Sequence, residues 1–211
     1  ATPRGEYVFH LAALPGVASI LAGMRPAPPG TVKSIFKPAE EGLPPGEQGG
    51  AKLMVAQGVL ENPRPAAIFG LHTRASLDVG LIGWAPGPML AASDVFRIVI
   101  HGRQAHGAMP HLSIDPIVTA SQVVLAFQTI RSRNLSPFEP SVVTVGMFRG
   151  GTRNNIIPGE VELQGTVRTY SEDVQNTIER RMREILDGTT AAAGATYEMT
   201  YTRYVPPTVN D

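Results

Sequence analysis

The sequence contains no cysteine among its 211 residues. Disulfides and thiolate metal sites are therefore excluded. An excess of charge of one sign is also absent, because lysine plus arginine and aspartate plus glutamate each total 18. A formal net charge of zero provides no basic field to attract nucleic acid or anionic lipid. We therefore expect no nucleic acid and no membrane as partner.

Long apolar runs are absent as well. No stretch reaches the roughly 18 apolar residues that a membrane-spanning helix needs, and residues 1–9 lack the apolar core of a signal peptide. Cytoplasm is the default compartment that these absences leave. What the sequence does contain is 43% hydrophobic residues, with glycine and proline spread as turns between apolar segments. This composition is typical of a globular chain with one large or two small domains.

The first 92 residues show apolar segments of alternating helical and extended type. The periodicity predicts helices at 11–24, where Pro15 interrupts the pattern, and at 48–57, and strands at 31–36, 66–71 and 79–84. Strands that alternate with helices favour an α/β layer structure. We expect residues 1–92 to form part of a larger α/β domain.

Residues 93–205 show a second, self-contained pattern. It predicts a strand at 94–101, a helix from Asp115-Pro116, strands at 142–148 and 160–169, a helix capped by Ser171, and a strand at 196–204. The order strand-helix-strand-strand-helix-strand is that of the split βαβ, or ferredoxin-like, fold. Residues 206–211 are expected to begin the return to the first domain.

Side chains able to bind a metal follow two of the predicted strands. Glu40 and Glu41 come after the strand at 31–36, and His72 ends the strand at 66–71. Carboxylate and imidazole are ligands that zinc and manganese accept, and an acid beside a ligand can act as a general base. On spacing alone, a solvated acidic loop and an ordinary histidine at a strand end remain an alternative.

A set of motifs in fixed order resembles the aminoacylase and hippurate-hydrolase amidohydrolases, within the aminoacylase/carboxypeptidase group of co-catalytic zinc metallopeptidases. The similarity covers nearly everything from about residue 10 onward. The matching segments are residues 30–42, 69–72, 106–111, 115–118, 155–158, 165–169 and 206–211.

This resemblance implies a two-domain enzyme that hydrolyses amide bonds in N-acyl amino acids or small peptide-like substrates. The larger domain of such enzymes binds one or two divalent ions, zinc or manganese. The smaller, ferredoxin-like domain is a lid and dimerisation domain, so the expected partner is a second copy of the chain.

The resemblance also implies roles for six residues. Glu40 is similar to the general base, and Glu41 and His72 are similar to metal ligands. His106 is similar to the lid histidine that polarises the scissile carbonyl, and Asn155 and Arg168 to the residues that hold the substrate carboxylate. A solvated loop histidine, a turn asparagine and a surface arginine stay open as alternatives for these three, and His101 and His111 are expected to be structural.

The chain departs from the family at its start. Family members carry Cys-Gly-His-Asp-x-His where this sequence reads Gly5-Glu6-Tyr7-Val8-Phe9-His10, so only His10 fits, and the family's last histidine ligand is absent. Glu41 and His72 alone match the usual ligands, whereas catalytic zinc normally has three. We therefore expect a fragment of an amidohydrolase that hydrolyses little or nothing alone and holds metal weakly or not at all. Two alternatives for the function of this chain are a non-catalytic dimerisation module and a protein that binds metal without turnover.

Overall fold

The computed structural model describes residues 3–38 and 50–211, with side chains described from residue 12 onward. The chain divides into two compact units, Ala1–Gly83 and Trp84–Asp211. This boundary precedes the predicted junction at residue 92, because β1 (Gly87–Leu90) pairs antiparallel with β8 (Thr208–Asn210) and both belong to the second unit. None of the helices in the described part of the chain has the length and apolar character that crossing a bilayer requires.

The first unit contains helices but, within its described residues, no strand. Its helices are α1 (Pro3–Gly23), which includes Pro15, and α2 (Gly50–Ala56). The prediction of strands at 31–36, 66–71 and 79–84 was therefore wrong. An extended segment becomes a strand only when a neighbour pairs with its backbone, and no described segment does so here. The apolar side chains of these segments consequently lie exposed; Phe69, for example, is 93% exposed.

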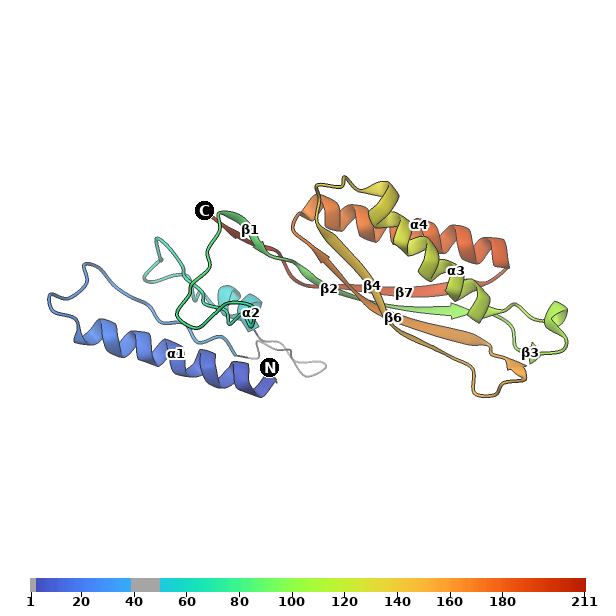
Figure 1. Ribbon diagram of the computed structural model, residues 1–211, viewed down its shortest axis with the longest axis horizontal. Coiled ribbons are helices and arrows are strands. Elements are labelled where there is room, and N and C mark those ends of the chain that lie inside the picture. Colours follow the sequence, from blue (N-terminus) through green and yellow to red (C-terminus); the bar gives the residue numbers. More distant parts are fainter. Residues whose placement is uncertain (1–2, 39–49) are drawn as a thin grey trace. The chain divides into compact units, whose positions relative to one another are not determined.

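The second unit contains one four-stranded antiparallel sheet covered by two helices. Its elements are β2 (Ser93–His101), α3 (Pro116–Thr129), β4 (Ser141–Gly150), β6 (Glu160–Thr169), α4 (Glu172–Ala193) and β7 (Thr196–Val205). The strand order is β4-β6-β2-β7, and both helices lie on the same face of the sheet (Figure 1). The six predicted elements of this region are confirmed, with strand ends within two residues.

The core lies between the sheet and the two helices. Phe96, Ile98 and Ile100 alternate along β2 and point into it, where they meet buried side chains of α3 and α4. The ring of Phe96 meets that of Phe127 edge to face, with centroids 6.2 Å apart. Gly165 allows this packing, because a Cβ there would lie 2.3 Å from Phe96 Cζ. The opposite face of the sheet is polar, as expected for an antiparallel sheet with one solvated side.

The predicted capping residues lie at the starts of both helices, but only one of them makes a capping hydrogen bond. The Asp115 carboxylate caps α3 by accepting hydrogen bonds from the backbone N–H groups of Ile117 (2.9 Å) and Val118 (3.2 Å). Ser171 occupies the cap position of α4, but its side chain makes no capping hydrogen bond, so that part of the prediction was wrong. Gly194, with φ +69°, ends α4 in the left-handed conformation that glycine adopts readily.

Candidate functional site

His106 lies in a short strand pair at one end of the second unit. It ends β3 (Ala105–His106), which pairs with β5 (Ile156–Ile157) so that His106 is opposite Ile156. The backbone N–H of Gly107 donates to the carbonyl of Asn155 at 2.8 Å. The fold therefore brings His106 and Asn155 side by side, although they are 49 positions apart in the sequence.

The loop that carries His106 is held at several points. Gly107 lies so close to Asn155 that a Cβ on this glycine would approach the Asn155 carbonyl oxygen to 3.2 Å. Arg103 exchanges backbone hydrogen bonds with Ile114, and its Nε donates to the Leu112 carbonyl at 2.9 Å. These contacts tie the loop that carries the exposed His106 to the segment before α3.

The hydrogen bonding of His106 defines its tautomer. The backbone N–H of Ala108 donates to His106 Nδ1 at 3.1 Å. Nδ1 must then carry a lone pair, so the proton of the neutral ring is on Nε2. An Nε2–H donor is the form of histidine that can stabilise a carbonyl oxygen or an oxyanion.

An open hollow of about 470 Å³ lies next to this strand pair. Its lining residues are Gly107, Asp115 and Ile117 together with residues 150–154, Ile156 and Ile157. The lining combines polar residues such as Asp115, Arg153 and Asn154 with apolar residues such as Ile117 and Ile156.

Arg168 lies at the opposite end of the four-stranded sheet. It is on β6 opposite Val142 of β4, and its Nη1 donates to the backbone carbonyls of Asp94 (3.3 Å) and Val167 (3.0 Å) and to the hydroxyl of Thr166. The side chain is partly buried on the polar face of the sheet. This ordered placement suits an arginine that receives a carboxylate.

The distance between the two ends of the sheet exceeds the size of a small substrate. Arg168 and Glu160 are eight residues apart on β6, which is about 26 Å at strand rise. Asn155 and His106 lie beyond Glu160, at the end of the sheet away from β1 and β8 (Figure 1). One copy of this unit therefore cannot place His106 and Arg168 on the same small molecule.

The predicted metal ligands lie in the first unit. Glu40 and Glu41 fall outside the described residues. His72 Nδ1 is 2.7 Å from the Thr73 carbonyl, which can only accept, so Nδ1 carries a proton and donates to this carbonyl. Metal-bound histidines commonly have this arrangement, so His72 fits the predicted role. Among the described residues, no group of three or more His, Cys, Asp or Glu side chains could hold a metal ion.

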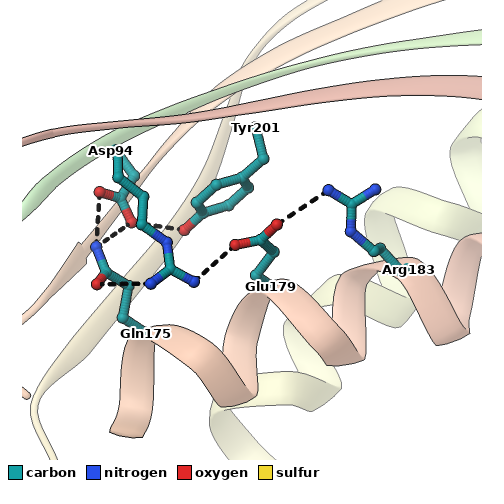
Figure 2. A network of polar contacts seen from close by, with 6 residues as sticks. Asp94, Gln175, Glu179, Arg183 and Tyr201 are labelled. Atoms are coloured by element: carbon teal, nitrogen blue, oxygen red, sulfur yellow. Dashed lines mark hydrogen bonds and ion pairs between the residues drawn. The ribbon is translucent and has the colours of Figure 1, made fainter. Parts of the chain in front are cut away.

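A buried polar network joins the sheet to α4 (Figure 2). Asp94 is fully buried on β2, and its carboxylate accepts hydrogen bonds from Gln175 Nε2 (2.8 and 2.7 Å) and from the Tyr201 hydroxyl (2.7 Å). The network was not predicted from the sequence, although Asp94 is in phase with the apolar residues of its strand. An acid on the core face of a strand is the signal that could have revealed the network.

The network continues to the surface through ion pairs. Arg203 donates to Gln175 Oε1 at 3.4 Å and to Glu179 at 2.7 Å, and Arg183 also donates to Glu179, at 2.9 Å. Burial alone would raise the pKa of Glu179, but the two guanidinium groups hold it below its usual value. Burial and the neighbouring Asp94 carboxylate raise the pKa of Tyr201, so this hydroxyl stays a donor.

This lowered pKa predicts acid sensitivity of the second unit. The carboxyl of Glu179 binds its proton more weakly in the folded state than in the unfolded state, so its contribution is complete above the unfolded pKa. The free energy of unfolding should decline as the pH falls from about 6 to about 3. Urea titrations across this range should show a smaller decline for Glu179→Gln. Equal slopes for wild type and variant would contradict the assignment.

Comparison with known proteins identifies the second unit. Residues 93–193 match the model of the peptidase dimerisation domain of the M20 family. The chain is 42% identical over 201 residues to an N-acyl-L-amino acid amidohydrolase of Geobacillus stearothermophilus, covering 95% of this chain and 53% of the relative. It is 38% identical over 203 residues to an N-acetylcysteine deacetylase of Bacillus subtilis, covering 96% and 52%.

A solved structure agrees with these relatives. A dinuclear metal-binding peptidase of the M20 family from Bacillus subtilis matches with a TM-score of 0.72 and 35% identity, over 96% of this chain and 49% of that one. The chain belongs to the M20 peptidase family. This M20 chain spans about half the length of the curated relatives that it matches.

Proposed function

We propose that the whole protein is a metal-dependent amidohydrolase that cleaves N-acyl amino acids or small peptide-like amides. The observation that carries the proposal is the similarity over 95% of the chain to an N-acyl-L-amino acid amidohydrolase. The M20 relative described as dinuclear supports one or two divalent ions as cofactor. The tautomers of His72 and His106 suit the roles proposed for them.

The chemistry is divided among a few side chains. Glu41 and His72 would hold a divalent ion, which when bound polarises water and the scissile carbonyl. Glu40 accepts a proton from the attacking water and returns it to the departing nitrogen. His106 donates from Nε2–H to the carbonyl oxygen as negative charge develops there. Arg168 pairs with the substrate carboxylate.

We infer further that the second unit is a ferredoxin-like lid through which two chains form a homodimer. The order of its elements and its β4-β6-β2-β7 sheet support the fold, and the match to a dimerisation domain supports the pairing. His106 and Arg168 of one chain lie too far apart to contact the same small substrate. If both contact one substrate, His106 and Asn155 must come from one chain and Arg168 from the other.

Arg168→Ala in the whole protein should raise KM for N-acetyl amino acids by about 10- to 100-fold, with a smaller change in kcat. The reason is the loss of a charge-assisted hydrogen bond to the substrate carboxylate. Steady-state kinetics test this prediction, with Arg97→Ala as the matched control. Arg97 is an exposed arginine on the same face of the sheet that pairs with Glu162. Equal effects of the two substitutions would contradict the role of Arg168.

The proposed function is tested by the release of amino acid from N-acetyl and N-benzoyl substrates. The whole protein should release amino acid, and both a chelator and Glu40→Gln should abolish the release. The 211 residues alone should release little or none, because only Glu41 and His72 match the family's ligands. Chelator-sensitive turnover by the 211 residues alone would contradict the expectation that they are inactive. A whole protein that releases no amino acid from any N-acyl substrate would contradict the proposed function.

A second candidate function is that of a non-catalytic dimerisation module. The match of residues 93–193 to a dimerisation domain favours it. It predicts a stable dimer of the whole protein in which Glu40→Gln and chelator change nothing measurable, so the same assay separates the two candidates.

A further inference from the structure

Arg168 differs from other arginines of the sheet in the groups that surround its charge. Arg97, on the same polar face, donates to the carboxylate of Glu162. Within the described ranges no carboxylate accepts a hydrogen bond from Arg168, whose acceptors are one hydroxyl and two backbone carbonyls. All three acceptors are neutral, so the charge of this half-buried guanidinium is left for an anion from outside the unit.

The hydrogen bonds of Arg168 also use only one side of its guanidinium. All three start from Nη1, the terminal nitrogen on the side of Cδ. Nε and Nη2 donate to no residue that the structure describes. The N–H groups of these two nitrogens point in the same direction along the other side of the group. That pair of parallel donors matches the two oxygens of a carboxylate.

Thr166 lies where it can hold Nη1 in place. Its hydroxyl donates to the backbone carbonyl of Asp94 at 2.8 Å, and its oxygen accepts from Nη1 of Arg168. Asp94 is itself held, because its buried carboxylate accepts hydrogen bonds from Gln175 and Tyr201 (Figure 2). Thr166 is β-branched, so its hydroxyl has few alternative orientations. The core network, the hydroxyl and the guanidinium therefore form one connected series of hydrogen bonds.

We propose that Thr166 is a positioning residue that fixes Nη1 of Arg168 and thereby presents Nε and Nη2 to the substrate carboxylate. The inference rests on the proposed function and adds the orientation in which the carboxylate binds. Without the hydroxyl, Arg168 keeps its charge but is no longer held in one orientation. Binding must then also order this side chain, which weakens the interaction with the carboxylate.

Thr166→Val in the whole protein should raise KM for N-acetyl amino acids by about 5- to 20-fold and change kcat less than about twofold. Thr166→Ser, which keeps the hydroxyl, should return KM to within about twofold of wild type. The matched control is Thr202→Val. Thr202 of β7 and Thr166 of β6 both lie opposite Val95 and are both half-buried, but the Thr202 hydroxyl bonds to none of the described residues.

The double variant shows whether Thr166 acts through Arg168. In the Arg168→Ala background, Thr166→Val should raise KM no further, because the side chain that it positions is gone. A further increase would contradict the inference. So would an unchanged KM for Thr166→Val beside a raised KM for Arg168→Ala, a result that leaves the proposed role of Arg168 intact. An unchanged KM for Arg168→Ala would instead refute that role, and the inference with it.

The fixed guanidinium is measurable without turnover, by NMR of arginine side chains in the 211-residue chain. Hydrogen bonds to Nη1 slow the rotation of the group about its Nε–Cζ bond, so its two Nη nitrogens should give separate signals. Loss of these signals in Arg168→Lys assigns them. Thr166→Val should merge them into one averaged signal, whereas Thr202→Val should leave them separate. Separate signals in Thr166→Val, or merged signals in the unsubstituted chain, would contradict the inference.

Discussion

His106→Ala should lower kcat of the whole protein by about 100- to 1,000-fold, with little change in KM. In the proposed mechanism the Nε2–H of His106 donates to the carbonyl oxygen. This hydrogen bond would strengthen as that oxygen becomes negative, so its loss would raise mainly the barrier to reaction. Steady-state kinetics with an N-acetyl amino acid measure the effect. His106→Gln, which keeps an N–H donor, should recover part of the loss.

The matched control is His111→Ala. His111 is exposed in the short helix Pro110–Leu112, only a few residues from His106. Its removal should change kcat less than about twofold if it has no contact with substrate. Similar losses of kcat in both variants would indicate that the substitutions disturb the loop. A loss of kcat below about tenfold for His106→Ala would show that His106 is not a catalytic residue.

Asp94→Ala should have the largest effect on stability, about 3–5 kcal/mol of unfolding free energy. The substitution leaves the buried Gln175 amide and the partly buried Tyr201 hydroxyl without their acceptor and opens a cavity at a fully buried position. Urea denaturation followed by far-UV circular dichroism measures the loss.

Tyr201→Phe is the control for this prediction. It removes one of the hydrogen bonds to Asp94 and keeps the carboxylate bonded to Gln175, so it should cost only about 1 kcal/mol. If the two substitutions lower the free energy of unfolding by about the same amount, the network stabilises the fold through the Tyr201 hydrogen bond alone. A loss below about 1 kcal/mol for Asp94→Ala would contradict the account of Figure 2.

The second unit could be predicted from the sequence because its signals are local. Alternation of Phe96, Ile98 and Ile100 identifies a strand with one buried face, and Asp115 before Pro116 identifies a helix start. The first unit could not be predicted in the same way. Apolar runs such as 66–71 specify an extended chain, but a strand also needs a paired neighbour, and the described residues supply none.

Strand pairing decides which candidate site residues lie close together, and their separation in the sequence does not. Asn155 and Arg168 are only 13 positions apart, which suggests proximity. Most of a ten-residue strand lies between them, so they are at opposite ends of the sheet. Conversely, His106 and Asn155 are distant in sequence and adjacent in the fold, because β3 pairs with β5. Strand pairing of this kind is not visible in residue spacing.

The division of the site between two chains is tested most directly by mixing inactive variants of the whole protein. At substrate concentrations well below the wild-type KM, His106→Ala and Arg168→Ala should each be nearly inactive when expressed alone. The two variants are then co-expressed with different tags and assayed at the same low substrate concentration. Random pairing gives half heterodimers, each with one intact site of two, so about a quarter of wild-type activity should return. His106→Ala with Asn155→Ala should recover nothing, because both residues come from the same end of one lid. Absence of recovery in the first mixture, with heterodimers present, would contradict the account.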